Sequence, residues 1–254
     1  MRNFRLIARL DIKAPNLVKG IQLEGLRKIG DPNVFAKRYY EEGIDEVIYQ
    51  DIVASLYERN SLVEIIEETT KDIFVPITVG GGIRTIEDVT KILNSGADKV
   101  SINTEAIKNP GIISEVAKRF GSQCMALSIE AKWIDSGWEA YFDNGREHSG
   151  LDVVNWAKEA ESRGAGEIVL TSVDREGTGK GFDVNLVKAV TDVVNIPVIA
   201  SGGMGKLVDI NEVALNANAD GIAMAHALHY GHLTVAEVRD YCLGQNISVR
   251  KVIL

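Results

Sequence analysis

The sequence contains few cysteines and few prolines. Its 254 residues include two cysteines, Cys124 and Cys242, and five prolines. Two widely separated thiols fit no metal-binding spacing and form no disulfide framework, so we expect neutral thiols in a reducing compartment. No proline- or serine-rich segment divides the chain, and a chain of this length can bury one large core. We therefore predict a single domain over residues 1–254 without a metal site.

The chain also lacks clusters of positive charge and long hydrophobic runs. Its formal net charge is −8, and no more than two basic residues are adjacent. This balance argues against nucleic acid as a partner. No apolar run is long enough to span a bilayer, and the first residues do not resemble a signal peptide. We expect a cytoplasmic protein without a nucleic-acid or membrane partner. A phosphorylated small molecule remains compatible, because backbone amides bind phosphate locally.

Segments of the first half return in the second half in the same order. Residues 7–13 resemble 126–132, residues 43–48 resemble 164–169, and residues 79–83 resemble 200–204. A shift of about 120 residues is too long for a solenoid repeat and fits two half-domains.

Short apolar runs alternate with longer amphipathic runs along the chain. The predicted strands are 4–10, 46–51, 75–79, 98–102, 124–130, 166–172, 196–200 and 220–224. The predicted helices lie near 31–43, 59–71, 85–95, 110–120, 152–163, 183–194, 206–217 and 234–243. Nearly continuous apolar runs are typical of parallel strands covered on both faces. Eight strand–helix units predict an α/β fold, a (β/α)8 TIM barrel built from half-barrels at about 1–121 and 122–254.

Two connections after predicted strands are unusually long. The first runs from Ile12 to Gly30, and the second, from Ala131 to Gly150, has the pattern of a small hairpin around residues 143–145. Loops in these positions lie on the catalytic face of a barrel and commonly act as lids. A disordered insertion is the alternative for each.

Two acids end equivalent strands of the two halves. Asp11 follows the first strand and Glu130 the fifth, so they face each other across the barrel mouth. Two such carboxyls can divide the roles of general acid and general base. The alternative is that they only pair with nearby lysines, among them Lys19.

Glycine-rich turns follow the third and seventh strands. Glycine lets a backbone approach an anion closely, and amides at a helix start can hold phosphate. Simple tight turns are the alternative. Asp51 ends the second strand, where it could orient a substrate hydroxyl or hold a lysine. The candidate phosphate sites comprise Gly81, Gly82, Asn103 and Thr104 on one side, and Thr171, Gly177, Ser201, Gly202 and Gly203 on the other. Two sites predict a ligand with an anion at each end.

Four charged residues lie near strand starts, at the opposite end of the barrel. They are Arg5, Glu46, Lys99 and Glu167. Two charges of each sign would balance there, as buried charges must. They predict either a structural plug or a gate to a central passage.

These segments together resemble one family over nearly the whole chain, the cyclase subunit of imidazole glycerol phosphate synthase. The related sugar-phosphate isomerase barrels share the architecture but not this run of segments. The matching segments are 7–11, 18–20, 30–32, 51–52, 79–83, 96–104, 120–123, 164–172, 174–175 and 200–203.

The resemblance implies a partner and a mechanism, and no cofactor. In this family a separate glutaminase subunit docks on the amino-terminal face of the barrel and releases ammonia, which crosses to the opposite face. There it attacks a linear bis-phosphate ribulosyl formimino compound, giving imidazole glycerol phosphate and aminoimidazole carboxamide ribonucleotide. The implied residues are the catalytic pair Asp11 and Glu130, the substrate contacts Lys19, Asp51, Asn103, Thr171 and Ser201, the phosphate contacts Gly82, Thr104, Gly177 and Gly203, and the ammonia gate Arg5, Glu46, Lys99 and Glu167.

The chain departs from the family at several positions on the catalytic face. Glu130 replaces an aspartate, Arg9 replaces a cysteine, and Glu176 replaces an aspartate, while Met224 and Ala225 replace small residues and a serine. The four gate residues are unchanged.

This pattern favours a paralogue that delivers ammonia for amidation of a surface-polysaccharide sugar, with a partner enzyme carrying the sugar chemistry in lipopolysaccharide biosynthesis. The alternative is a genuine histidine-biosynthetic cyclase, a carbon–nitrogen lyase. A single-subunit sugar-phosphate isomerase and an inert scaffold for the glutaminase are two further hypotheses.

Overall fold

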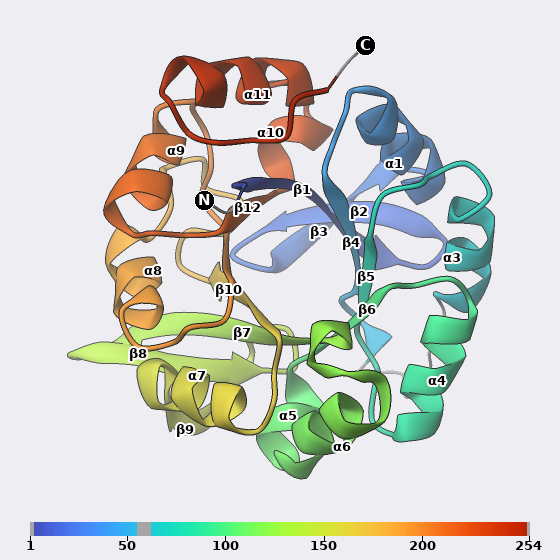
Figure 1. Ribbon diagram of the computed structural model, residues 1–254, viewed down its shortest axis with the longest axis vertical. Helices are drawn as coiled ribbons and strands as arrows, with labels where there is room; N and C mark the ends of the chain where they lie inside the picture. Colours follow the sequence, from blue (N-terminus) through green and yellow to red (C-terminus); the bar gives the residue numbers. More distant parts are fainter. Residues whose placement is uncertain (1–2, 55–61, 253–254) are drawn as a thin grey trace.

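The computed structural model describes residues 3–54 and 62–252, and its centre is a closed ring of parallel strands (Figure 1). The ring closes where β12 pairs with β1, from Arg5 beside Gly221 to Ala8 beside Met224. In ring order the eight strands are β1 (Arg5–Lys13), β4 (Glu46–Asp51), β5 (Ile77–Gly80), β6 (Lys99–Ile102), β7 (Met125–Ile134), β10 (Glu167–Ser172), β11 (Val198–Ser201) and β12 (Gly221–Met224). The predicted TIM barrel is confirmed.

Helices cover the outside of this ring (Figure 1). They are α1 (Pro32–Glu41), α3 (Val63–Thr69), α4 (Ile86–Asn94), α5 (Thr104–Lys108), α6 (Gly111–Phe120), α7 (Val153–Ser162), α8 (Val184–Thr191), α9 (Asp209–Asn211) with a π-helical turn at Glu212–Asn216, α10 (His226–His229) and α11 (Val235–Gly244). The side chain of Asp31 caps α1, and Thr85 and Asp88 form a capping box on α4. Residues 59–61 of the predicted helix 59–71 lie outside the described ranges. None of the helices described is long and apolar enough to cross a membrane.

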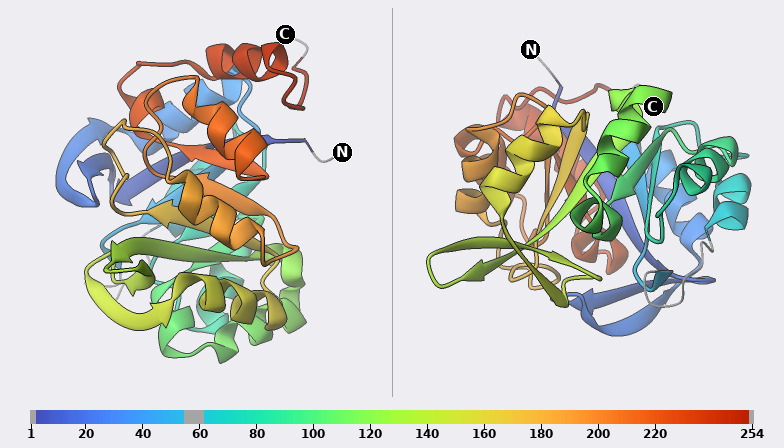
Figure 2. Two further views of the ribbon diagram at one scale, coloured as in Figure 1. Left: turned by 90° about the vertical axis from the view of Figure 1, so that its left-hand side faces the viewer. Right: turned by 90° about the horizontal axis from the view of Figure 1, so that it is seen from below.

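Both long connections are antiparallel hairpins. The second, with β8 (Gly137–Phe142) and β9 (Glu147–Asp152), was predicted, whereas the first was expected to be a loop and is instead built from β2 (Asn16–Ile21) and β3 (Glu24–Gly30). β2 continues the sheet by pairing with the end of β1, and the turn at Gln22 and Leu23 has positive φ at both residues. Both hairpins project from the same end of the barrel, opposite the chain termini (Figure 2).

Side chains of β1 alternate between the outer core and the barrel interior, as the two-residue period of a strand requires. Leu6, Ala8, Leu10 and Ile12 belong to the core between strands and helices. The intervening residues therefore face inward, in layers about 7 Å apart. One interior layer is apolar and is formed by Ile7, Ile48, Ala126, Val169, Ile199 and Ala223.

Candidate functional site

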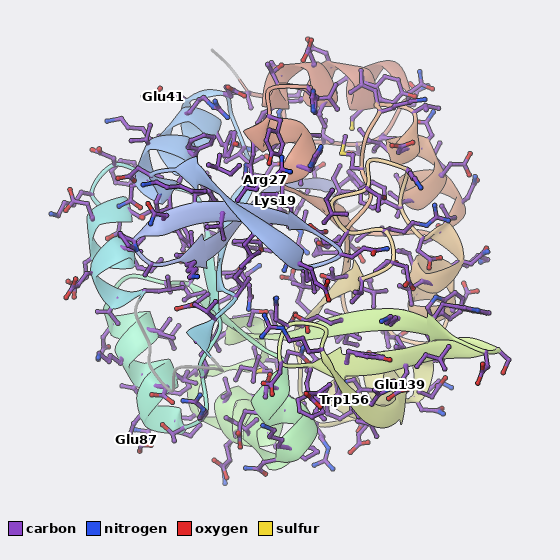
Figure 3. All side chains as sticks on the ribbon, turned by 180° about the vertical axis from the view of Figure 1, so that it is seen from behind. Lys19, Arg27, Glu41, Glu87, Glu139 and Trp156 are labelled. Atoms are coloured by element: carbon purple, nitrogen blue, oxygen red, sulfur yellow. The ribbon has the colours of Figure 1, made fainter. Side chains whose placement is uncertain are left out.

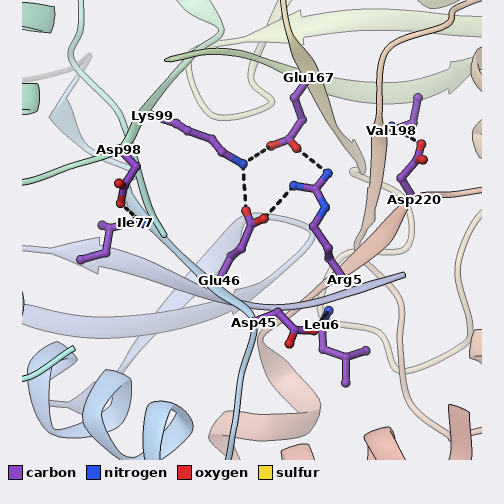
Figure 4. A network of polar contacts seen from close by, with 10 residues as sticks. All are labelled: Arg5, Leu6, Asp45, Glu46, Ile77, Asp98, Lys99, Glu167, Val198 and Asp220. Atoms are coloured by element: carbon purple, nitrogen blue, oxygen red, sulfur yellow. Dashed lines mark hydrogen bonds and ion pairs between the residues drawn. The ribbon is translucent and has the colours of Figure 1, made fainter. Parts of the chain in front are cut away.

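The four predicted gate residues form a closed ring at the amino-terminal ends of the strands (Figure 4). Arg5 contacts Glu46 at 2.8 Å and Glu167 at 2.5 Å. Lys99 contacts the same two carboxylates at 2.9 and 3.4 Å. Burial would raise the pKa of Glu46, but Lys99 and Arg5 hold it below its ordinary value. The ring is therefore charged, balanced and partly shielded from water.

A second charged network lies at the opposite end of the interior. The Arg9 guanidinium contacts Asp11 Oδ1 at 2.9 Å, and Lys19 Nζ contacts Asp11 Oδ2 at 2.9 Å. Lys19 also forms an ion pair with Glu176. Burial would raise the pKa of Asp11, but Arg9 and Lys19 hold it far below its ordinary value. Asp11 is thus a fixed carboxylate, and Lys19 contacts Asp11 and Glu176 rather than Asp51.

Arg9 also contacts two of the predicted substrate-binding residues. Its Nη1 atom donates hydrogen bonds to Thr171 Oγ1 at 2.8 Å and to Ser201 Oγ at 3.3 Å. Arg9 therefore contacts Asp11 and also engages two hydroxyls on β10 and β11.

The β2–β3 hairpin holds Lys19 over this network, and Figure 3 labels Lys19 on the hairpin. The Gln22 amide donates to the carbonyl of Glu176 at 2.8 Å. Asn144 of the other hairpin donates to the carbonyl of Leu23 at 3.3 Å. The two hairpins and the segment after β10 thus contact one another over the barrel mouth.

The predicted residues of the first phosphate site line one cavity of about 150 Å³. Gly81 and Gly82 adopt φ values of 99° and 70° there, and a Cβ atom on Gly81 would lie 2.2 Å from the Asp51 carbonyl oxygen. Lining residues from the prediction are Asp51, Gly81, Gly82, Asn103, Thr104 and Glu130, while the sequence reasoning missed Arg84, Lys108 and Asp143. Arg84 stands two residues after the glycine turn, which is the signal that could have revealed it.

The turn of the β8–β9 hairpin contacts Glu130. The Gly145 amide donates a hydrogen bond to Glu130 Oε2 at 2.7 Å, and the Asp143 amide donates to Thr104 Oγ1 at 3.2 Å. Burial raises the pKa of Glu130 to about 7, although Arg9 and the Gly145 amide act against this rise. Asp11 and Glu130 therefore differ in protonation, one fixed as a carboxylate and the other able to exchange a proton near neutral pH.

The predicted residues of the second phosphate site line a much smaller cavity. Its volume is about 20 Å³, close to the roughly 10–15 Å³ that one ordered water needs. Glu176, Met224 and His226 also line it, and the sequence reasoning missed His226. Its predicted members are Gly177, Ser201, Gly202 and Gly203, whereas Thr171 is not among the lining residues. The two phosphate sites lie at the same end of the barrel, but their cavities differ in volume.

Among residues 3–54 and 62–252, no three His, Cys, Asp or Glu side chains are close enough together to bind a metal ion. What the site offers is a charged acid, a protonatable acid and a cavity lined by glycine turns.

The unusual state of Glu130 gives a pH-dependent prediction. The ordinary pKa of a glutamate is near 4.5, and that of Glu130 in the folded chain is about 7. Between these two pH values the folded chain binds one more proton at Glu130 than the unfolded chain does. Protonation of Glu130 therefore stabilises the folded chain. The stabilisation is fully present below pH 4.5 and is lost as the pH rises through 7. This difference between the two pKa values corresponds to about 3 kcal/mol in the free energy of unfolding.

Denaturant unfolding at pH 5 and pH 8 tests this. The native chain is expected to lose about 2.5 kcal/mol more than a Glu130→Gln variant over this interval. Glu147→Gln, which alters an exposed carboxyl of the β8–β9 hairpin, should track the native chain. Parallel losses in the native and Glu130→Gln chains would contradict the prediction.

Comparisons with known proteins give consistent matches. The family model described as "Histidine biosynthesis protein" matches residues 5–234. The imidazole glycerol phosphate synthase subunit HisF of Legionella pneumophila is 63% identical over 212 residues, covering 83% of this chain and all of the relative. The subunits HisF of Pyrococcus furiosus and of Lactococcus lactis are each 48% identical, over 246 and 248 residues, and cover 97% of this chain and 98% and 96% of the relatives.

Proposed function

Because the chain belongs to the histidine biosynthesis protein family, with the HisF subunits of imidazole glycerol phosphate synthase as relatives, we propose that it is the ammonia-using cyclase subunit of a glutamine amidotransferase complex. A separate glutaminase subunit docks as a heterodimer partner on the face that carries the ring of Arg5, Glu46, Lys99 and Glu167. Ammonia enters through this ring and reacts at the opposite end of the barrel.

The observation that carries this proposal is the line of inward-facing residues on β1. Arg5 belongs to the charged ring, Ile7 to the apolar layer, and Asp11 to the reaction site. Neutral ammonia can cross an apolar layer that excludes unpaired ions, because burying an unpaired charge is very costly. The apolar layer would thus admit neutral ammonia while keeping ions out.

The acceptor that the relatives' name supports is the bis-phosphate ribulosyl formimino compound of histidine biosynthesis. Ring closure with ammonia requires proton transfers at the reacting nitrogen and oxygen atoms, which positioned acids and bases accelerate by roughly 10² to 10⁴. Glu130 is suited to this exchange, since burial raises its pKa to about 7. Asp11, held as a carboxylate by Arg9 and Lys19, would stabilise positive charge that develops beside it.

A second acceptor is favoured by the changes at the second phosphate site. Arg9 donates hydrogen bonds to the hydroxyls of Thr171 and Ser201. The cavity beside Gly202 is only large enough for about one water molecule. In this case the chain would deliver ammonia for amidation of a surface-polysaccharide sugar held by a partner enzyme, and the cyclase reaction would be weak or absent.

Turnover of the bis-phosphate compound with ammonium chloride, beside a calorimetric titration of the same compound, tests the acceptor. The cyclase proposal expects ammonia-dependent turnover that Asp11→Asn lowers at least about 100-fold, while Lys132→Ala on the β7–β8 hairpin leaves it unchanged. Absence of turnover and of tight binding would contradict the cyclase reaction and favour the second acceptor. Gel filtration with a glutaminase subunit tests the heterodimer, which two separate peaks would contradict.

A further inference from the structure

The turn of the β8–β9 hairpin has an unusual backbone. Asp143, Asn144 and Gly145 all adopt positive φ values, of 50°, 60° and 73°. Positive φ is uncommon for residues other than glycine, although aspartate and asparagine tolerate it better than most. Two amides of this turn donate hydrogen bonds to side chains of other elements. The bent backbone therefore does more than reverse the direction of the chain.

These two hydrogen bonds fix the turn against β7 and against the start of α5. The Gly145 amide donates to Glu130 Oε2 at 2.7 Å. The Asp143 amide donates to Thr104 Oγ1 at 3.2 Å, and this hydroxyl donates back to Asp143 Oδ1 at 3.4 Å. The contacts of Asp143 with Thr104 thus help to keep the neighbouring Gly145 amide on the carboxyl of Glu130.

The space around Gly145 suits no other residue. A Cβ atom on Gly145 would lie 3.0 Å from Leu23 Cδ1 and 3.5 Å from Val173 Cγ2. A side chain there would also have to adopt the left-handed backbone that L residues disfavour. Glycine is thus the residue type that lets this amide approach Glu130.

The hydrogen bond from Gly145 distinguishes the two oxygens of Glu130. An amide N–H donates preferentially to the unprotonated oxygen of a carboxyl group, because the other oxygen carries the O–H. With Oε2 accepting from Gly145, the exchangeable proton of Glu130 is favoured on Oε1. Glu130, Asp143 and Asn144 line the same cavity of about 150 Å³. A ligand in this cavity therefore meets an acid whose orientation is set by the turn.

We propose that the turn of residues 143–145 positions Glu130 for proton exchange during the reaction. Gly145 holds Oε2 of this carboxyl, and Asp143 fixes the turn on Thr104. Asp143 and Gly145 are positioning residues, whereas Glu130 is the group that exchanges the proton. This inference rests on the cyclase reaction proposed above, to which it adds residues outside the barrel strands.

The groups around Glu130 act on its pKa in opposite directions. Burial is the largest cause that raises this pKa to about 7, and the charges of Asp11 and Asp143 act in the same direction. Arg9 and the Gly145 amide act against them. Four more charged residues line the same cavity, namely Asp51, Arg84, Glu105 and Lys108. All of these groups stay in place when one residue of the turn is changed, so the two positioning residues can be tested singly.

Carbon-13 NMR of the glutamate side-chain carboxyls tests the proposal, with the Glu130 signal identified by its absence from a Glu130→Gln chain. Asp143→Asn keeps an acceptor oxygen for Thr104 and removes one negative charge. The pKa of Glu130 should therefore fall by about 0.5–1 pH unit. Gly145→Val should raise this pKa by about the same amount, because a β-branched residue does not fit this φ and the amide leaves Oε2.

Matched variants of the two turns and strands of this hairpin region serve as controls. Asp135→Asn changes an exposed aspartate that also has a left-handed backbone, with φ of 49°, in the turn between β7 and β8. Gly150→Val places valine at a glycine of φ 74° on β9, where a Cβ atom would meet nothing within 4 Å among the described residues. Both should leave the pKa of Glu130 unchanged.

Turnover of the bis-phosphate compound with ammonium chloride gives a second measurement on the same variants. The pH profile of kcat should move down in pH for Asp143→Asn and up for Gly145→Val, following the pKa of Glu130. Gly145→Val should also lower kcat by at least about tenfold with little change in KM, because a displaced acid is lost to the transition state more than to binding.

Shifts of the Glu130 pKa in the same direction in both variants, or no shift in Asp143→Asn, would overturn the proposal. The second criterion decides the outcome even if Gly145→Val does not fold. Opposite shifts that leave kcat and its pH profile unchanged would also overturn it. Absence of turnover by the native chain contradicts the cyclase reaction instead, and the NMR titration still decides whether the turn positions Glu130.

Discussion

Replacing Lys19 with methionine is expected to lower the free energy of unfolding by about 3–5 kcal/mol at pH 7, because it leaves buried carboxylates without their cation. The Lys19 side chain is 2% exposed and pairs with Asp11 and Glu176. Asp11 keeps Arg9 as a partner, but Glu176 has no second cation among the ion pairs of the described residues. For a chain of this size such a loss lowers the melting temperature by roughly 6–20 °C.

The pH dependence of the stability lost in Lys19→Met shows whether unpaired carboxylates cause it. Arg9 and Lys19 lower the pKa of Asp11 against the effect of burial, so this pairing stabilises the chain above pH 4 and is lost as pH falls. The difference between the native and Lys19→Met chains should therefore shrink in acid, as the carboxyls of the variant take up protons.

Urea denaturation of matched variants measures the effect. Lys28→Met removes an exposed lysine of the same hairpin and should cost less than about 0.5 kcal/mol. The double variant Lys19→Met/Glu176→Gln should recover part of the stability, since it no longer buries the second carboxylate. A loss below about 1 kcal/mol for Lys19→Met would show that the network contributes little.

Glu167→Leu is the second substitution with a large expected effect, a loss of about 3 kcal/mol. Glu167 contacts both Arg5 and Lys99, so its removal leaves two cations sharing Glu46 alone. The double variant Lys99→Met/Glu167→Leu removes one charge of each sign and leaves the Arg5–Glu46 pair. It should lose less stability than the sum of the two single variants.

A double-mutant cycle from the same denaturation curves checks this, with an expected coupling energy of about 1–3 kcal/mol. Glu147→Leu, at an exposed position outside the ring, serves as the control. Additivity within about 0.5 kcal/mol would mean that the four residues do not act as one ring.

Much of the barrel could be predicted because its signals are local. Apolar runs such as residues 166–172 mark parallel strands, and the glycine turn marks a place, Gly81, where a side chain does not fit. The charged ring was also predictable in part, since Arg5 and Glu46 stand at strand starts and strand starts share one end of a barrel.

The remaining features depend on contacts that the sequence does not mark. The β2–β3 hairpin turns at Gln22 and Leu23, and neither residue type favours the positive φ that both adopt. The ion pair of Lys19 with Glu176 joins segments that only the folded barrel brings together. The unequal cavities follow from side-chain packing around Met224 and Glu176, which no periodicity reveals.

The pairing of β12 with β1 also joins segments that are far apart in the order of synthesis. β1 is made long before one of its two barrel neighbours, Gly221–Met224, leaves the ribosome. Until then the nascent chain carries unpaired strand edges on β1 and β11, and such edges attract other chains. Pairing of Gly221–Met224 with both strands removes these two edges and closes the barrel.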